Sequence, residues 1–301
     1  MYYHLVVSHS LIMKNNKNRD LLITLVSYLA CIGIGFVSCF YINNNYLLQV
    51  LVFTVTATVV IYIISIFLKN ASLYDPCWSI IPPIVALYLF IKIGNYSWEN
   101  IILLVSLWLW GIRLTINWVI NFSGFDSYID WRYVMLTKDK PVIIKQLINL
   151  FGIMMFPTLM VYIAFVPLTF TFIYPSKEIA VIGGILIFIG FLLELISDHQ
   201  MRSYLRSTKE RKVCTKGLWN YSRHPNYLGE NLVWIGISVA MLLTTTDYWY
   251  YSFGGLAMLL MFLLITMPMM EKRQKERRQD YKEYMRTTSY FLILPHLKRK
   301  F

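Results

Sequence analysis

The segment GLWNYSRHPNYLGE, residues 217–230, gathers side chains able to do chemistry at the point where an apolar run begins. Pro225 suits the first position of a helix, where its missing N–H is harmless, and it pushes His224 out of the helical region. A helix that begins there places Asn226 and Glu230 on one face. Its amino end attracts anions. The segment therefore predicts a polar site that can bind an anion at the start of an apolar helix.

Charged residues also occur inside other apolar runs. Arg113 lies within LWLWGIRLTINW, and Glu194 and Asp198 lie four residues apart near the end of a further run, with Arg202 continuing their face. Because a charge near a bilayer centre costs about 2.5–3.5 kcal/mol, each of these residues needs a reason. Arg113 either reaches towards the interface or meets an anion inside the protein. Asp198 and Arg202 form either an ordinary surface pair or part of a site.

The elements that position these residues are apolar helices. Hydrophobic residues make up 57% of the 301, charged residues 15%, and the mean hydropathy is +0.53, which is typical of a membrane protein. Runs long enough to cross a bilayer lie at about 21–42, 46–68, 78–94, 100–121, 149–174, 179–198, 227–246 and 248–270. Prolines in the third and fifth runs could kink them. We therefore predict an all-α, polytopic bundle of seven or eight transmembrane helices.

The basic residues indicate the topology. With eight spans, twenty-five of the 28 lysines and arginines fall in segments on one side, which predicts cytoplasmic N- and C-termini. The net charge of +12 then reflects topology, and no nucleic-acid partner is indicated. We expect a cytoplasmic tail over 1–20 and one membrane domain over 21–298. The KRKF ending suits the endoplasmic reticulum or another intracellular membrane.

The four cysteines show no metal-ligand spacing and are expected to be buried thiols. Neither a metal site nor a disulfide framework is indicated.

Six motifs follow one another in a specific order: DPCW (75–78), WGIR (110–113), DWRY (130–133), ELISDHQ (194–200), the segment 217–230 and the basic tail 271–295. This set resembles the membrane-bound steroid 5α-reductase and sterol reductase superfamily, and most closely its DUF1295 branch. The resemblance implies a helical bundle whose carboxy-terminal half, about 179–298, holds NADPH and opens to the cytoplasm. It also implies a lipid-accessible cavity between the helices.

The resemblance implies where that cofactor would be held. Its contacts would come from the counterparts of Arg113, Arg132, Asp198, Arg202, Tyr221, Arg223, His224, Asn226, Tyr227 and Glu230. The chemistry agrees, because the phosphates of NADPH need several guanidinium groups. No GxGxxG fingerprint is present, so the cofactor would sit on the membrane fold itself.

The implied activity is NADPH-dependent reduction of an activated C=C bond in a steroid, sterol or other lipid enone, in the CH–CH class of oxidoreductases. Asp75, Tyr74 and Tyr133 are candidate proton donors, with Asp75 and Tyr133 favoured as catalytic; Trp110 stands where the family's tyrosine would be expected.

Two alternatives stay open. The RHPxY element also occurs in isoprenylcysteine carboxyl methyltransferases, which use S-adenosylmethionine, and a non-catalytic transporter or scaffold would use buried charges to line a pathway.

Overall fold

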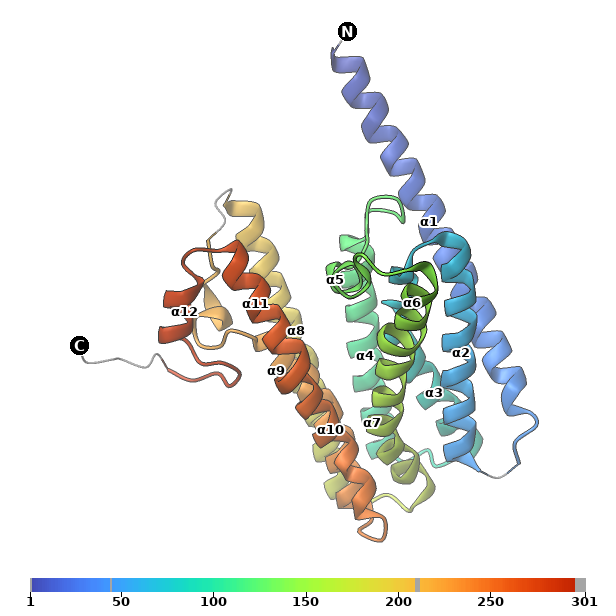
Figure 1. The fold of residues 1–301 in the computed structure, drawn as a ribbon. Coiled ribbons are helices and arrows are strands. Elements are labelled where there is room, and N and C mark those ends of the chain that lie inside the picture. Colours follow the sequence, from blue (N-terminus) through green and yellow to red (C-terminus); the bar gives the residue numbers. More distant parts are fainter. Residues whose placement is uncertain (1, 44, 209–211, 296–301) are drawn as a thin grey trace. The chain divides into compact units, whose positions relative to one another are not determined.

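The computed structural model describes residues 2–43, 45–208 and 212–295, with side chains described from residue 16 onward (Figure 1). Within these ranges the regular elements are helical, and one isolated bridge joins Ser222 to Ser289. The all-α prediction is confirmed for this part of the chain. Two compact units form: unit 1 comprises Met1–Leu89 with Leu114–Tyr162, and unit 2 comprises Phe90–Arg113 with Ile163–Phe301. The prediction of a single membrane domain stays a prediction.

Unit 1 holds the amino-terminal elements and the segment Leu114–Tyr162, which begins inside the fourth span. Its elements are α1 (Tyr2–Cys39), α2 (Tyr46–Leu68), η1 (Ala71–Tyr74), most of α3 (Cys77–Ile93), the end of α4 (Trp98–Asn121), α5 (Trp131–Thr137), α6 (Val142–Leu147), the π-helical η2 (Ile148–Met155) and the start of α7 (Phe156–Ile173).

Unit 2 holds the first two-thirds of α4, the rest of α7 and the carboxy-terminal elements. These are η3 (Glu178–Ala180), α8 (Val181–Ser207), η4 (Gly217–Asn220), α9 (Pro225–Thr244), η5 (Trp249–Ser252), α10 (Phe253–Met261), the π-helical η6 (Phe262–Thr266), α11 (Met267–Arg277) and α12 (Tyr281–Thr287).

Eight helices within the described residues are long and apolar enough to cross a membrane, which confirms the eight runs read from the sequence. They are Asn16–Cys39, Tyr46–Leu68, Ala71–Ile93, Trp98–Asn121, Val142–Ile173, Glu178–Ser207, Pro225–Thr244 and Trp249–Arg277. The chain is thus an integral multi-pass membrane protein. The cytoplasmic placement of its termini and its location in the endoplasmic reticulum stay predictions.

Proline explains two irregular stretches in the long fifth and eighth spans. The π-helical segment Ile148–Met155 ends just before Pro157, and the π-helical segment Phe262–Thr266 ends just before Pro268. A proline ring clashes with the carbonyl four residues earlier, and a wider turn relieves that clash without breaking the helix. Both spans therefore run on through their prolines as helices.

The first helix is longer than the apolar run that it contains. Its backbone is helical from Tyr2, although the expected tail covers 1–20, because no glycine or proline occurs before Gly33 to interrupt it. The spanning part by length and composition is Asn16–Cys39.

Helices α8 and α9 of unit 2 pack closely along their length (Figure 1). A Cβ on Gly190 would lie 2.5 Å from the Gly229 carbonyl oxygen, and one on Gly183 would lie 2.5 Å from the Gly236 carbonyl oxygen. In each helix the two glycines are seven residues apart, so they share a face and let the antiparallel backbones touch.

A buried carboxylate holds the loop between α4 and α5 of unit 1. Asp20 of α1 is 1% exposed, and its Oδ2 accepts a hydrogen bond of 2.8 Å from the Phe125 amide. Asn70 donates to the carbonyls of Phe125 and Tyr128, at 2.8 Å each. These contacts fix the start of α5, which carries Tyr133.

We expect Asp20→Ala to destabilise unit 1 by about 1–3 kcal/mol, because the Phe125 amide would be buried without an acceptor. Asp20→Asn keeps one acceptor oxygen and should cost less. Thermal unfolding of the purified protein in detergent, followed by fluorescence, measures both. Equal unfolding temperatures for Asp20→Ala and the wild type would show that the loop does not depend on this carboxylate.

Candidate functional site

The segment 217–230 has the local structure that its sequence predicts. Pro225 opens α9, and His224 before it has non-helical backbone angles, φ −139° and ψ 55°. Gly217 has φ +58°, a conformation that favours glycine, and its neighbour Leu218 donates an amide hydrogen bond of 2.8 Å to Gln200 of α8. The motif is thereby attached to the end of α8.

The segment after α12 folds back along the loop before α9. The Arg223 amide donates to the Ser289 carbonyl at 2.9 Å, and the Ser222 hydroxyl donates to the Phe291 carbonyl at 2.7 Å. Tyr284 of α12 also donates to the Ser222 carbonyl, at 3.2 Å. The carboxy-terminal segment therefore fixes the turn at residues 223–225, called here the RHP turn.

Glu271 of α11, a buried carboxylate, also fixes the RHP turn. Its carboxylate accepts hydrogen bonds from Arg223 Nη1 at 3.1 Å, His224 Nε2 at 3.2 Å and the Tyr281 hydroxyl at 3.2 Å. Since a carboxylate only accepts, His224 carries its proton on Nε2. Burial holds the pKa of His224 below its usual value, although the nearby Glu271 carboxylate acts to raise that pKa. The imidazole is therefore neutral at pH 7.

Next to this network lies a cavity of about 260 Å³, called here the aromatic pocket. Its lining mixes four aromatic rings, two arginines and several apolar side chains. The lining includes Trp219, Arg223, His224, Asn226, Tyr227, Arg278, Tyr281 and Tyr284. The Tyr227 ring stacks on His224, with centroids 5.3 Å apart and planes 7° apart. The pocket can thus accept a flat group beside an anion.

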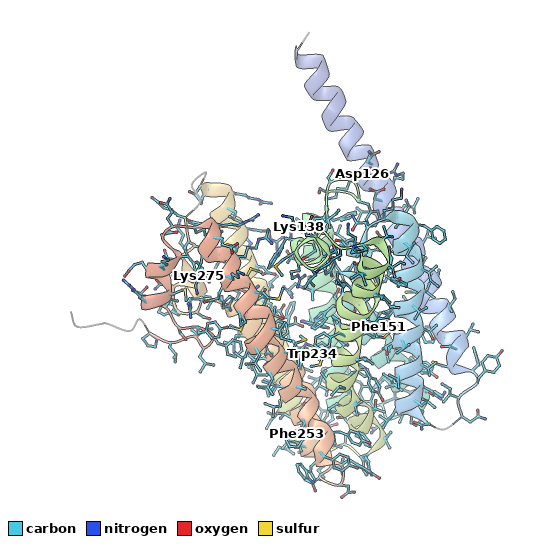
Figure 2. The ribbon with its side chains drawn as sticks, viewed as in Figure 1. Asp126, Lys138, Phe151, Trp234, Phe253 and Lys275 are labelled. Carbon is cyan, nitrogen blue, oxygen red and sulfur yellow. The ribbon has the colours of Figure 1, made fainter. Side chains whose placement is uncertain are left out.

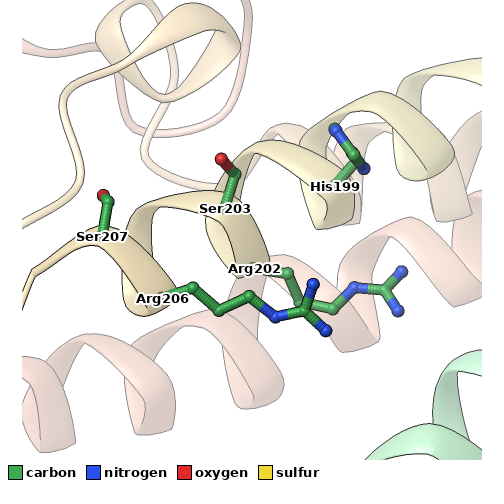
Figure 3. Close-up of a pocket in the computed structure, with 5 residues that line it drawn as sticks. All are labelled: His199, Arg202, Ser203, Arg206 and Ser207. Carbon is green, nitrogen blue, oxygen red and sulfur yellow. The ribbon is translucent and has the colours of Figure 1, made fainter.

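A second, open cavity of about 470 Å³ lies on the last turns of α8 (Figure 3) and is called here the α8 arginine pocket. It is lined by His199, Arg202, Ser203, Arg206 and Ser207. At 27 residues, α8 is roughly 40 Å long and exceeds a hydrocarbon core of about 30 Å. We infer that these polar last turns extend beyond the hydrocarbon, where a water-soluble anion can reach them.

Arg113 lies between two carboxylates of α8. Its Nη1 donates to Asp198 Oδ2 at 2.7 Å, and its Nη2 pairs with Glu194. The Arg113 and Glu194 side chains are 8% and 5% exposed. Arg113 therefore meets anions inside the protein and does not reach towards solvent. Glu194 Oε1 and Arg113 Nε have no hydrogen-bond partner among the described residues.

Glu230 of α9 is held by two tryptophans. Trp110 Nε1 donates to one carboxylate oxygen at 3.0 Å, and Trp234 Nε1 donates to the other at 2.9 Å. The two indoles pack edge to face with centroids 5.5 Å apart. These bonds explain how a carboxylate 5% exposed is tolerated one turn into an apolar helix. Trp110 stands where the family resemblance implies a tyrosine, and it donates a hydrogen bond to Glu230.

Unit 1 carries the two residues predicted to be catalytic, and they are in contact. The Tyr133 hydroxyl donates to Asp75 Oδ1 at 2.6 Å. Asp75 Oδ2 is buried and has no partner among the described residues. Burial, with the nearby Asp75 charge, raises the pKa of Tyr133 above its usual value, so the phenol keeps its proton at neutral pH. Arg132 pairs with Asp130 at 2.9 Å, at the start of α5.

The predicted cofactor residues are thus distributed over several clusters. Arg223, His224, Asn226 and Tyr227 line the aromatic pocket, and Arg202 lines the α8 arginine pocket. Arg113 and Asp198 pair with each other, Glu230 lies between two indoles, and Tyr221 is 42% exposed. Arg132 belongs to unit 1. Which of them touch a cofactor stays a prediction.

Sequence reasoning missed several residues of these clusters. Glu271, Arg206, Arg278 and Tyr281 were not singled out individually, because they lie in segments rich in charge where no single side chain stands out. One signal existed for Glu271: it is the first charged residue after a long apolar run ending in MPMM. Within the described residues, no cluster of three or more His, Cys, Asp or Glu side chains could hold a metal ion. The four cysteines are buried thiols, as predicted.

The fold and these polar clusters define a multi-pass helical membrane protein with cationic pockets in its carboxy-terminal part. The family model described as "Protein of unknown function (DUF1295)" matches residues 61–288, and the chain belongs to this family. It is similar to "Uncharacterized protein C594.04c" of Schizosaccharomyces pombe (strain 972 / ATCC 24843), with 26% identity over 245 residues, 72% of this chain and 67% of the relative. No solved structure matches it. The DUF1295 prediction is confirmed.

Proposed function

We propose that this protein is a membrane oxidoreductase that binds NADPH on unit 2 and reduces an activated C=C bond in a lipid enone. The observation that carries the proposal is the α8 arginine pocket. Arg206 has no ion pair with any described residue. Asp198 lies one turn before Arg202 on α8, but Asp198 is bonded to Arg113. Guanidinium and hydroxyl groups on one exposed helix face are suited to bind phosphate oxygens.

The aromatic pocket supports the same ligand. Arg223 is 8% exposed, and its Nε is buried without a hydrogen-bond partner among the described residues. Arg278 lines the same cavity, and Tyr227 and Trp219 offer flat faces for a ring. Such a cavity suits a nucleotide base or ribose next to a phosphate. By contrast, Arg113 is already paired with two carboxylates, Glu194 and Asp198. It is therefore a weaker phosphate ligand than Arg223, which is paired with Glu271 alone, or than Arg206, which has no ion pair with any described residue.

NADPH, when bound, supplies the hydride for this reaction. Arg202, Arg206 and Arg223 would neutralise its phosphates, and Asn226 would hydrogen-bond the sugar or carboxamide. Reduction of an enone also needs a proton. Tyr133 is a protonated phenol bonded to Asp75, and Asp75 Oδ2 is buried without a hydrogen-bond partner among the described residues. This pair is our candidate proton donor.

One observation favours a second function, methyl transfer from S-adenosylmethionine. The aromatic pocket has Trp219, Tyr227, Tyr281 and Tyr284 in its lining. Aromatic faces attract cations such as a sulfonium. That cofactor has no phosphate, however, and leaves the α8 arginine pocket without a role.

We expect the purified protein, in lipid nanodiscs, to bind NADPH more tightly than NADH or S-adenosylmethionine, because only NADPH carries a 2′-phosphate. Arg202→Ala and Arg206→Ala should each weaken NADPH binding about tenfold, the loss of one charge-assisted contact. Titration with quenching of tryptophan fluorescence measures all of these affinities.

The matched control is Arg286→Ala. Arg286 is 69% exposed, pairs with Glu283 on α12 and lines neither pocket, so its loss should leave affinity unchanged. Tight binding of S-adenosylmethionine without binding of NADPH would replace the proposal with the second function. Binding of neither would favour a transporter or scaffold.

A further inference from the structure

We infer that Glu271 is a positioning residue, which orients Arg223 and His224 for binding a ligand in the aromatic pocket. The inference rests on the proposed function for the identity of that ligand, NADPH. Glu271 lies on α11, is 5% exposed and accepts hydrogen bonds from both residues of the RHP turn. One carboxylate therefore links both side chains of the RHP turn.

The contacts of the Arg223 guanidinium leave its Nε without a hydrogen-bond partner among the described residues. Nη1 bonds Glu271 at 3.1 Å, and the guanidinium carbon lies 5.0 Å from the centre of the Tyr290 ring. Nε, by contrast, is buried and unpartnered among the described residues. Arg223 also lines the aromatic pocket. A guanidinium held by Glu271 and by the Tyr290 ring, with an unpartnered Nε, is pre-organised for an acceptor such as a phosphate oxygen.

The same carboxylate fixes a flat surface. Glu271 bonds His224 Nε2 at 3.2 Å, and the imidazole stacks on Tyr227 with the planes 7° apart. Holding the imidazole thereby holds the orientation of the Tyr227 ring in the pocket lining. The Tyr281 hydroxyl, bonded to Glu271 at 3.2 Å, fixes the carboxylate in turn.

Two roles for Glu271 predict opposite results. If it only neutralises Arg223, its removal leaves a freer cation, and an anion should bind more tightly. If it positions Arg223, its removal leaves the guanidinium less ordered, and the same anion should bind more weakly. The sign of the change therefore separates positioning from neutralisation.

The experiment is titration of NADPH into Glu271→Gln, Tyr281→Phe and wild-type protein in nanodiscs. We expect affinity to fall about ten- to a hundredfold in Glu271→Gln, because charge-assisted bonds are lost. Tyr281→Phe keeps every charge and should give a smaller fall, about two- to fivefold, from one neutral donor. Glu283→Gln is the matched control, since Glu283 is 66% exposed and its loss changes the charge equally.

A ligand-free measurement accompanies it. In ¹⁵N-histidine NMR, the pKa of His224 should fall in Glu271→Gln, because the carboxylate that favours the imidazolium is gone. The other groups facing His224 are Arg223 beside it, Tyr227 of α9 and Tyr290 after α12, and all are unchanged in that variant.

The outcomes are distinct. Weaker NADPH binding together with a lower His224 pKa supports the inference, and if Glu271→Gln does not fold, Tyr281→Phe decides it. Unchanged or tighter binding in the folded variants overturns the inference and leaves the proposed function standing. If the wild type itself does not bind NADPH, the proposed function fails, and an unchanged His224 titration would then overturn the positioning role as well.

Discussion

Arg113→Met is expected to destabilise unit 2 by about 3–5 kcal/mol, because it removes the cation from a buried ion cluster. Arg113 is the cation between Glu194 and Asp198, and both carboxylates accept from it. Without it, two carboxylates stay close together in an apolar span, and Glu194, the more buried of the two, loses its ion-pair partner. Loss of the folded protein from detergent extracts and a lower unfolding temperature are the measurements.

Compensating substitutions make this prediction sharp. The triple variant Arg113→Met, Glu194→Gln, Asp198→Asn removes the cation together with both anions, and it should regain most of the stability, because a buried ion pair can often be replaced by neutral groups. If the single variant is as stable as the wild type, the cluster contributes nothing to the fold. If the triple variant is no better than the single one, packing of the arginine stem is the cause.

Gly229→Val carries the second large effect, about 3 kcal/mol or more, because a Cβ there has no space. It would lie 2.6 Å from both the Gly190 carbonyl oxygen and Glu194 Cγ. The contact is with backbone, which cannot move aside without separating α8 from α9. Since α8 also carries Glu194 and Asp198, separation would disturb the Arg113 cluster too. Thermal unfolding again measures the effect.

Gly33→Ala is the matched control for helix glycines. A Cβ at Gly33 in α1 meets nothing within 4 Å, so this change should be neutral or slightly stabilising, through helix propensity alone. If Gly229→Val unfolded at the same temperature as Gly33→Ala, the close α8–α9 contact would not exist in the membrane. A Gly229→Ala variant should fall between the two, since alanine adds only the Cβ itself.

The structure changes the interpretation of Glu230 in particular. From the sequence, an acid one turn into an apolar helix indicated a ligand contact, because an unpaired carboxylate there would be costly. The structure shows two indole donors, Trp110 and Trp234, that satisfy it. Glu230 can therefore be explained by packing, and the case for a cofactor rests more on Arg202, Arg206 and Arg223.

Much of the architecture followed from the sequence by itself. A bilayer core requires long apolar helices, and that requirement is local, so eight spans and the helix start at Pro225 could be predicted from run lengths and one proline. The charged residues of the candidate site could also be identified from the sequence, because a charged residue within an apolar run is conspicuous.

Only the tertiary structure decided which charges pair. Arg113 is 81 residues from Glu194, and Arg223 is 48 from Glu271; separations of this size leave no trace in local pattern, because a contact depends on which helix faces turn toward each other. The same holds for Tyr133 and Asp75, which are hydrogen-bonded although they lie 58 residues apart. Asp20 and Asn70 hold in place the loop that precedes Tyr133. Sequence thus determined which residues needed partners, and helix packing determined who the partners are.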